Sequence, residues 1–411
     1  MSMVRRLAVV MVCVGMSSLA TWAAPPAGGE WPGFRGPNRD GKSPDTGLLK
    51  QWPEGGPALL WKVDGIGNGF SSVTVSGGTV YITGDRGGKL VVTALGLDGK
   101  VKWAVPVDAA WTRSHPGSRC SVTIDSGKAY VLSGNGVLGC LDAKTGKGLW
   151  SSDLTRLGGK PGGWGYAESP LIVDNMVVVK PGGKNCIVAL NKATGKGIWA
   201  STGFSAGPEY SSCYLFQHDN VPMIATGTRS GIVCVAAKTG QLLWSNGFSA
   251  NNTANCPTPV YSDGYVFWAN GYGKGGICLK LAGTGSRATA EEAWKTKDMV
   301  CHHGGFIILD GYIYGNNGGG WSCLELKTGR QTWNERAVGK GSLCFADGML
   351  YLFGESGGKA ALASFSPEKM ELRGTVTVAG SGPSWAHPVV VGGRLYLRYD
   401  DNLYCFDVKA Q

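Results

Sequence analysis

Short runs of alternating apolar and polar residues recur along most of the chain, and each run is broken by a tight turn of glycine or asparagine. Residues 73–83 (VTVSGGTVYIT) and residues 306–315 (FIILDGYIYG) show this pattern clearly. Alternation with a period of two predicts strands with one buried face, and a central Gly or Asn predicts a hairpin turn. Runs with the helical period of about 3.6 residues are scarce, so the pattern predicts an all-β chain.

The turns recur at a nearly constant spacing. One turn residue per unit marks eight units at intervals of 37 to 49 residues: Gly78, Gly127, Asn175, Asn220, Gly264, Gly311, Gly348 and Gly393. A unit of about four strands cannot bury both faces of its small sheet alone, and radial stacking of such units makes a β-propeller.

A second motif repeats with the same count. It consists of a small residue, a Thr-Gly turn and a Trp ten positions after the small residue, and its complete copies are Cys140–Trp150, Ala189–Trp199, Cys234–Trp244 and Cys323–Trp333. A shortened copy ends at Trp103, an expanded copy runs from 278 to 294, and Trp61 precedes them all. A decayed copy surrounds residues 365–372, where the Trp is lost.

The last unit, residues 385–408, contains only three strand segments. We therefore expect residues 59–63 to supply its fourth strand and to close the ring, which leaves no unpaired edge between the first and last blades. The predicted fold is an all-β, eight-bladed β-propeller of four-stranded antiparallel blades over residues 57–411. A pair of β-sandwiches is the competing fold, but sandwiches do not require a self-similar Trp period.

The residues before the repeats predict export. Residues 1–23 have a basic start, an apolar stretch and a Thr-Trp-Ala end, which is typical of a signal peptide. The apolar stretch is shorter than the roughly 20 residues that span a bilayer. We expect a periplasmic or extracellular protein with no transmembrane segment in the mature chain. Residues 24–56 form an N-terminal extension of unassigned role, and the simplest expectation is that residues 31–42 strap the outer surface.

Charge and cysteine content exclude several classes of protein. The net charge of +10 is spread along the chain as isolated lysines, which favours a solvated surface over nucleic-acid binding. Eleven of the 12 cysteines follow the predicted signal peptide, and no C-x-x-C pair occurs, which argues against zinc-ribbon, thioredoxin-like and c-type haem chemistry. We expect free buried thiols and a monomer.

The repeated motif resembles the tryptophan-docking motif of the PQQ-like (quinoprotein-type) β-propeller family, and the resemblance covers residues 59–408. In that family the small first residue packs on the Trp of a neighbouring blade, which implies a compact apolar role for Cys140, Cys234, Cys278, Cys323 and Cys405. The eight-bladed form is shared by PQQ-dependent alcohol dehydrogenases and BamB-like outer-membrane assembly proteins. Residues 31–42 and 163–171 look like segments of a third group, exported BamB-like propellers without a known activity.

Residues just before each inner strand predict one mouth of the central channel. Positions seven to nine before each marker turn give a ring rich in charged and aromatic residues, with His387 near it: Phe70, Arg119, Glu168, Ser212, Asn255, His302, His303, Lys340 and Trp385. Cations from separate blades would concentrate positive charge in a funnel, so the ring predicts a site for a small anion, with Glu168 paired to one of the cations. The alternative is that these polar residues are simply solvated at the channel mouth and bind no ligand. His302 and His303 could hold a metal, but adjacent strand residues point to opposite faces, so at most one should face the channel.

The leading functional hypothesis is an exported, non-catalytic binding or assembly scaffold, with a cell-envelope protein or a small anionic ligand as its partner and no assigned cofactor. The alternative is a PQQ- and calcium-dependent alcohol dehydrogenase. The resemblance would then place calcium at Glu168, Asn255 and Asp298, with Asp298 abstracting the substrate proton. The adjacent disulfide that those enzymes place over the cofactor is absent from the sequence, which weighs against this alternative.

Overall fold

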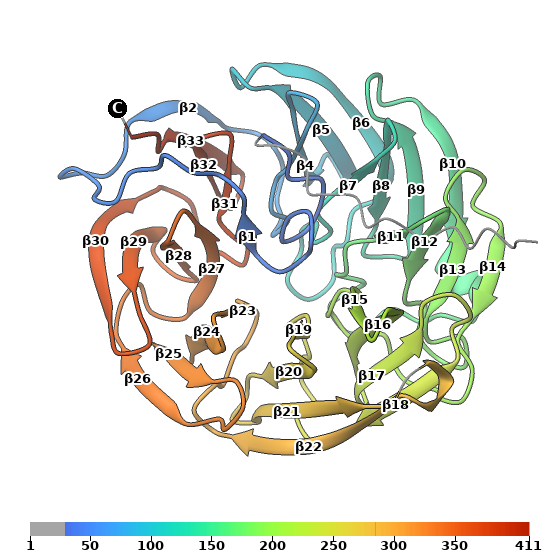
Figure 1. Ribbon diagram of the computed structural model, residues 1–411. Coiled ribbons are helices and arrows are strands. Elements are labelled where there is room, and N and C mark those ends of the chain that lie inside the picture. The colour runs from blue at the N-terminus through green and yellow to red at the C-terminus, as the bar shows by residue number, and fades with distance from the viewer. Residues whose placement is uncertain (1–28, 284, 411) are drawn as a thin grey trace, which may run out of the picture.

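The computed structural model describes residues 29–283 and 285–410. The predicted signal peptide, residues 1–23, lies outside the described residues. Figure 1 shows eight sheets around a central axis, and their antiparallel ladders confirm the predicted eight-bladed propeller. The helical elements within the described ranges are two 3-10 turns, Leu154–Leu157 and Gly285–Arg287. None of the helices in the described part of the chain is long and apolar enough to cross a membrane.

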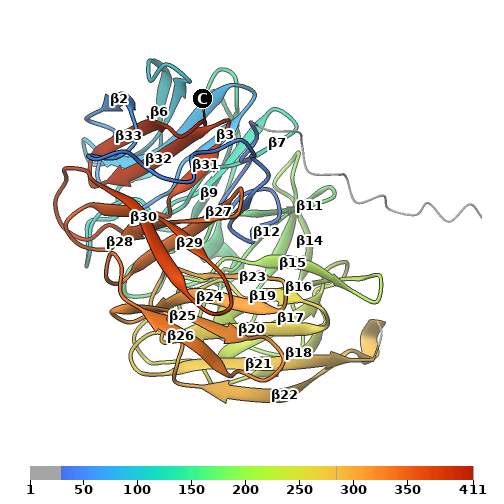
Figure 2. The ribbon, with the colours of Figure 1, turned by 60° about the vertical axis from the view of Figure 1, so that its left-hand side comes forward.

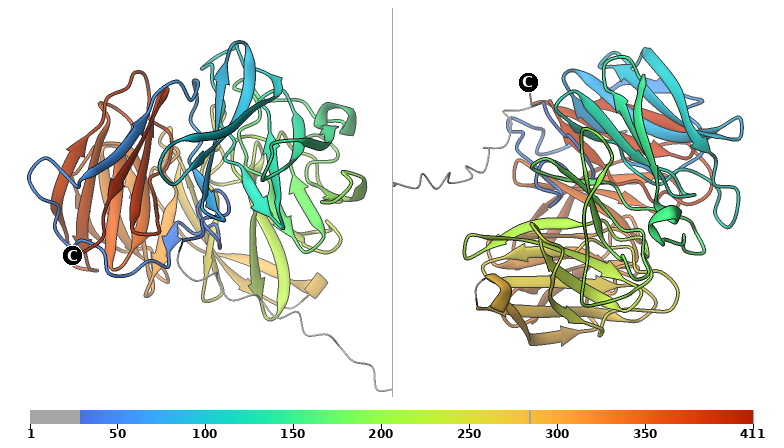
Figure 3. Two further views of the ribbon diagram at one scale, coloured as in Figure 1. Left: turned by 90° about the horizontal axis from the view of Figure 1, so that it is seen from above. Right: turned by 90° about the vertical axis from the view of Figure 1, so that its right-hand side faces the viewer.

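Seven blades are continuous in sequence, and each has four strands that run from the central axis outward. Blades 1 to 3 are β3–β6 (Thr74–Ser76, Thr79–Arg86, Lys89–Gly96, Val101–Ala109), β7–β10 (Thr123–Asp125, Lys128–Leu132, Val137–Asp142, Gly148–Asp153) and β11–β14 (Leu171–Val173, Met176–Val179, Val188–Asn191, Gly197–Ala200). Blades 4 and 5 are β15–β18 (Tyr214–His218, Val221–Thr228, Gly231–Ala236, Leu242–Asn246) and β19–β22 (Val260–Ser262, Tyr265–Asn270, Gly275–Ala282, Thr289–Thr296). Blades 6 and 7 are β23–β26 (Phe306–Leu309, Tyr312–Asn317, Gly320–Glu325, Gln331–Glu335) and β27–β30 (Gly341–Ala346, Met349–Gly354, Lys359–Phe365, Met370–Thr377). The colours in the side views of Figure 3 follow this order around the ring.

The eighth blade joins the two ends of the chain. It contains β31 (Val389–Val391), β32 (Arg394–Tyr399) and β33 (Asn402–Asp407), and its outer strand is β2 (Leu59–Val63). Strand β2 lies beside β33 (Figure 2). The two strands pair antiparallel, with Trp61 opposite Cys405. The predicted closure by the N-terminal strand is confirmed.

Glycines in the turns make the contact between neighbouring blades. Trp150 of blade 2 donates its indole N–H to the carbonyl of Lys192 in blade 3 at 3.2 Å, and its ring covers Gly195, whose φ is +73°. A Cβ at Gly195 would lie 2.6 Å from the ring, so only glycine fits. The resemblance implies that Cys140 packs on the Trp of a neighbouring blade. In the strand ladder, Cys140 lies opposite Trp150 of its own blade. The same pairing of a Trp with the next glycine turn recurs at Trp61 and Gly99, Trp103 and Gly146, Trp199 and Gly240, and Trp294 and Gly329.

Serine residues just before the inner strands tie successive blades together near the axis. The backbone N–H of His387 donates to Ser72 Oγ at 2.8 Å, and the N–H of Ser72 donates to Ser121 Oγ at 3.0 Å. The relay continues from Ser121 to Ser169 and from Ser169 to Ser212, each at 3.0 Å. These bonds satisfy backbone donors that would otherwise be buried without partners. Ser212 of the predicted ring therefore serves blade packing.

The N-terminal extension enters the centre of the ring, and the expectation that it straps the outer surface is wrong. We call residues 30–45 the plug. Its strand β1 (Lys42–Ser43) pairs in parallel with the inner strand β27, and Trp31 forms a bridge with Val75 of β3. Figure 1 shows this segment in front of the axis. One end of the channel is thus filled by the chain itself.

Two buried arginines anchor the plug. Arg39 donates to the carbonyls of Ser169 and Cys213 at 3.0 and 3.1 Å and also to that of Pro170, while Arg35 donates to the carbonyl of Phe306. These carbonyls belong to the starts of the inner strands of blades 3, 4 and 6. Burial lowers the pKa of Arg39 to about 10, so the guanidinium stays charged at neutral pH. One charged group thereby bridges two blades with strong hydrogen bonds.

The cysteines agree with the expectation of free thiols. All eleven cysteines within the described residues are unpaired, and every one except the half-buried Cys256 is buried. Their burial raises the pKa of each thiol, for example to about 12 at Cys120. They behave as small apolar residues of the core.

Candidate functional site

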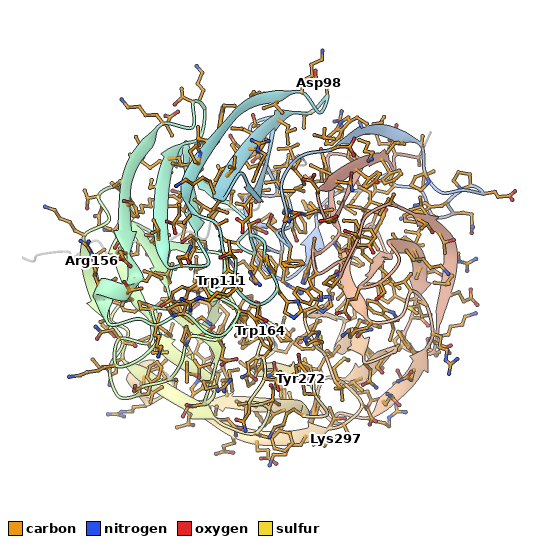
Figure 4. The ribbon with its side chains drawn as sticks, turned by 180° about the vertical axis from the view of Figure 1, so that it is seen from behind. Asp98, Trp111, Arg156, Trp164, Tyr272 and Lys297 are labelled. Atoms are coloured by element: carbon orange, nitrogen blue, oxygen red, sulfur yellow. The ribbon has the colours of Figure 1, made fainter. Side chains whose placement is uncertain are left out.

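The end of the channel opposite the plug gathers the loops that carry most of the chemistry. In each blade the chain starts its inner strand at this end, and the hairpin between the second and third strands returns to it. We call this end the open mouth. Figure 4 views the molecule from this side, with Trp111, Trp164 and Tyr272 toward the middle and Asp98, Arg156 and Lys297 at the periphery.

Aromatic rings from several blade connections meet at the open mouth. This mouth cluster consists of Phe70, His115, Trp164, Tyr210, Tyr272, His302 and Trp385. His115 lies at its centre, with its ring centroid 5.1 Å from that of Trp385 and 6.0 Å from that of Trp164. Trp385 is 4.5 Å from Phe70, and Trp164 is 5.4 Å from Tyr210. Such contiguous, partly exposed aromatic surface is typical of a recognition site.

The connection between blades 1 and 2, residues 110–122, contributes positive charge to the mouth. Arg119 stacks 5.4 Å over Phe70 and donates to the carbonyls of Gly117 and His115. Burial lowers the pKa of Arg119 to about 10. No carboxylate of the described residues lies within ion-pair distance of its guanidinium, whereas Lys340 is paired with Glu355. Asp85 opposes this pKa shift from beyond ion-pair distance, so Arg119 lies beside the aromatic rings without a direct acidic partner among the described residues.

A compact polar group lies on the other side of Trp385. His302 and His303 turn toward each other, with their Nδ1 atoms 3.4 Å apart, because residues 301–305 form a bend and not a strand. The strand alternation behind the expectation that at most one of them faces the channel therefore does not apply to this segment. Lys340 Nζ lies 3.4 Å from His302 Nδ1 and 2.5 Å from Glu355. Trp385 donates its indole N–H to Glu355 at 2.7 Å.

Burial keeps the histidines of this group neutral. It lowers the pKa of His302 to about 4, and Lys340 acts in the same direction. Burial likewise lowers the pKa of His303 well below its usual value and that of His387 to about 3. His387 Nε2 lies 3.1 Å from the carbonyl of His303, and its ring packs against Phe34 of the plug at 5.1 Å. At neutral pH the imidazoles therefore offer lone pairs and carry no charge.

Glu168 lies below the mouth, next to the plug. It is 1% exposed and accepts the backbone N–H of Lys180. Burial raises its pKa to about 7, while Lys180 and Arg39 oppose that shift. The expectation that Glu168 pairs with a cation of the mouth ring is wrong, because the cations near it are Lys180 and Arg39.

Asn255 organises a loop. Its side chain donates to Glu209 at 3.2 Å and to the carbonyl of Asn251 at 3.0 Å, and its Oδ1 accepts the N–H of Asn251. It is fully buried. Glu209 in turn pairs with Arg229 at 3.0 Å. A cleft of about 590 Å³ opens beside this group and beside Trp164 of the mouth cluster.

The calcium set of the dehydrogenase alternative does not form. Glu168 contacts Lys180, Asn255 contacts Glu209 and Asn251, and the exposed Asp298 contacts Thr296 at 3.4 Å. The three residues share no hydrogen-bond partner among the described residues. The guanidinium of Arg39 occupies the channel beside Glu168, where it binds the carbonyls of Ser169 and Cys213. The residues present do not fit calcium-bound PQQ.

The positions predicted from the strand register include only part of the residues that form the open mouth. It identified Arg119, His302, His303, Lys340 and Trp385, and it placed Glu168 and Asn255 with them although both are buried in other networks. It missed the residues that hairpins and loops bring to the same end: His115, Trp164, Tyr210, Tyr272 and Glu355. Tyr272 and Glu355 follow second strands, which end at the face where first strands begin, so the alternation of strand direction could have found them.

Comparison with known proteins places the chain among propellers of the outer-membrane assembly type. The family model described as "Outer membrane protein assembly factor BamB" matches residues 88–335, which is more than half of the chain. A curated relative with that name, from Moranella endobia (strain PCIT), is 26% identical over 226 residues. The match covers 52% of this chain and 54% of the relative, so it spans about half the length of that curated relative.

Solved structures share the fold. BamB from Moraxella catarrhalis superposes with a TM-score of 0.62 at 15% identity, over 86% of this chain and 98% of that one. Quinohemoprotein alcohol dehydrogenase from Comamonas testosteroni superposes with a TM-score of 0.65 at 13% identity, over 93% of this chain and 80% of that one. At such low sequence identity, these similarities support a shared fold only. On the match of the family model, the chain belongs to the family of outer membrane protein assembly factor BamB, a family of PQQ-like β-propellers.

Proposed function

We propose that the protein is an exported, non-catalytic binding and assembly scaffold of the cell envelope, which takes up an anionic group at its open mouth. The group is a carboxylate or phosphate, presented by a partner protein or by a small molecule. The names of the matching family and of the Moranella relative refer to outer-membrane assembly, which supports a place in the envelope. The signal-peptide pattern of residues 1–23 supports export.

The observation that carries this proposal is that Arg119 lies within a surface of aromatic rings and, among the described residues, forms no ion pair, with Asp85 acting on it only from a longer distance. Arg113, an exposed residue of the same connection, adds a second cation 5.3 Å from the ring of Trp111. The connection contains no acidic residue between positions 110 and 122. Anions are attracted to such a place, while aromatic rings supply rigid contact area at low entropic cost.

The plug strengthens the proposal for a scaffold. It fills the channel from the opposite end with Arg35 and Arg39, so a partner reaches the axis only from the open mouth. The residues of the calcium set of the dehydrogenase alternative contact different partners, which favours a scaffold over that enzyme.

Tryptophan fluorescence provides the test, because Trp164 and Trp385 lie in the mouth cluster. We would titrate the purified exported protein with an acidic Glu-rich peptide and, separately, with glutarate. Arg113→Gln should weaken binding by about 2- to 5-fold at low salt, since one partly exposed charge contributes about 0.5–1 kcal/mol. Binding should weaken further as salt screens the charges. Arg156→Gln, which removes an exposed arginine at the periphery, is the matched control.

Two results would overturn the proposal. One is peptide and glutarate binding that is absent or equally strong in Arg113→Gln and Arg119→Gln. The other is calcium-dependent binding of PQQ in a parallel titration, which would restore the dehydrogenase alternative. A response to the peptide but not to glutarate would identify the source of the anion as a protein partner.

A further inference from the structure

His302, His303 and Glu355 bring three ligand atoms to one point of the open mouth. One atom from each residue lies within 4.8 Å of the other two. The Nδ1 atoms of the two histidines are 3.4 Å apart. Two ligands bound tetrahedrally at about 2.1 Å from a zinc ion are also separated by about 3.4 Å. The separation of the two nitrogens therefore already matches a shared ion.

Neighbouring groups orient two of the three ligands, His302 and Glu355. Lys340 approaches His302 Nδ1 as a donor, so that nitrogen carries a lone pair and Nε2 carries the proton, which faces Tyr272 Oη at 3.0 Å. Trp385 donates to Glu355 at 2.7 Å. A hydrogen bond to the side of a ligand away from the ion supports metal ligands in proteins, and His302 and Glu355 have one, whereas His303 Nε2 is buried without a hydrogen-bond partner among the described residues.

The backbone beneath the ligands is also held. His387 donates a hydrogen bond from Nε2 to the carbonyl of His303 at 3.1 Å, and its ring packs edge-on against that of Phe34 in the plug. The bend of residues 301–305, which turns the two imidazoles together, is thus supported from inside the channel. A site held in this way does not need to be assembled when the ion arrives.

We propose that His302, His303 and Glu355 form a site for a divalent transition-metal ion of the zinc type at the open mouth. Two imidazoles and one carboxylate select zinc, cobalt or iron(II) over calcium and magnesium, which prefer oxygen ligands. Three protein ligands leave a coordination position for water or for a carboxylate. The proposal goes beyond the scaffold function and does not depend on it.

Lys340 provides the discriminating feature of this proposal. Its ammonium group lies against two of the three ligands, 3.4 Å from His302 Nδ1 and 2.5 Å from Glu355, and so occupies the side from which an ion binds. A metal ion must displace this ammonium. Removing its charge should therefore strengthen metal binding, whereas a purely structural role of Lys340 predicts only a less stable mouth.

The site is tested by calorimetric titration with zinc and by the absorption spectrum of bound cobalt. Both use the full exported chain, purified without a histidine tag and treated with a chelator. The wild type should bind one zinc ion per chain, and cobalt should give visible d–d bands of low coordination number. Glu355→Gln should weaken zinc binding by at least about 10-fold and His303→Ala by at least about 100-fold, since even outer-shell partners cost about 10- to 100-fold. Lys340→Met should tighten it.

His218→Ala is the matched control, because His218 lies on β15 and contacts Tyr261 and Asp219, away from the three ligands. Its zinc affinity should equal that of the wild type. Glu355→Gln preserves the shape of the side chain and keeps the test valid if His303→Ala fails to fold. No binding by the wild type, equal binding by Glu355→Gln, or weaker binding by Lys340→Met would overturn the proposal. Arg113→Gln should leave zinc binding unchanged, which separates this test from that of the scaffold function.

Discussion

Replacing Gly195 by alanine tests whether the glycine turns determine how the blades pack. Gly195 has a φ of +73° and lies under the ring of Trp150 from the preceding blade. A Cβ at this position would lie 2.6 Å from the ring, too close for any relaxed contact. Gly197, two residues further along, has an ordinary φ and open space around its Cβ position. The same substitution at these two sites should therefore have opposite effects.

The magnitude follows from two costs. A non-glycine residue in the left-handed region costs about 1–2 kcal/mol, and overpacking against a rigid ring costs about 1–3 kcal/mol. Gly195→Ala should thus lower the free energy of unfolding by about 2–5 kcal/mol. Gly197→Ala should raise it by about 0.4–1 kcal/mol, because alanine restricts the unfolded chain without strain in the fold.

Differential scanning calorimetry of the two variants measures the difference. The unfolding entropy of about 2.1 cal/mol/K per residue means that each kcal/mol moves the midpoint of a chain of this size by about 1 °C. Gly146→Ala and Gly148→Ala provide an independent pair, since Gly146 lies under Trp103 with a φ of +75° and Gly148 has open space. Equal midpoints for the two members of either pair would refute the reasoning.

Two further predictions concern the plug and its surroundings. Arg39→Met should lower the free energy of unfolding by about 2–5 kcal/mol, because it leaves the buried carbonyls of Ser169 and Cys213 without a donor, whereas Arg156→Met should have no measurable effect in the same urea titration. Burial raises the pKa of Glu168 from 4.5 to about 7, so its neutral form stabilises the fold below pH 4.5, and that stability is lost as the pH rises through about 7. Urea midpoints measured between pH 4 and pH 8 should therefore fall less steeply in Glu168→Gln, which accepts the Lys180 N–H but cannot ionise; parallel curves would contradict this.

The repeat made most of the fold predictable from the sequence. Each marker turn needs positive φ, as at Asp310 and Gly311, and the three-strand final unit left one place for residues 59–63. The plug was not predictable in the same way. Its two arginines bind backbone carbonyls whose positions depend on the assembled ring, so the sequence of the segment does not reveal their partners.

The site was predictable only where it follows the strand register. Arg119, Lys340 and Trp385 lie on that register and reach the mouth. Glu168 shares the register, but its side chain is buried near Lys180 and Arg39. No pattern in the residues around Glu168 predicts this burial. The convergence of His302 and His303 depends on a bend at 301–305 that follows a short connection, and strand alternation gave the opposite expectation.

The plug and β2 give the chain an unusual order of assembly. Both are synthesised early, yet some of the partners of this region come last: β2 pairs with β33, the Asp45 carboxylate accepts from Gly393 N–H, and Ala410 N–H donates to the carbonyl of Gly47. Contacts across such sequence distances form slowly, because the intervening chain must be ordered first. Strand β2, Asp45 and Gly47 therefore stay without these partners until the last blade has been made, although Trp31 and Arg39 find theirs in earlier blades. Closure of the ring is therefore a late step, and a chain that lacks its final blade also lacks the partners of β2, Asp45 and Gly47.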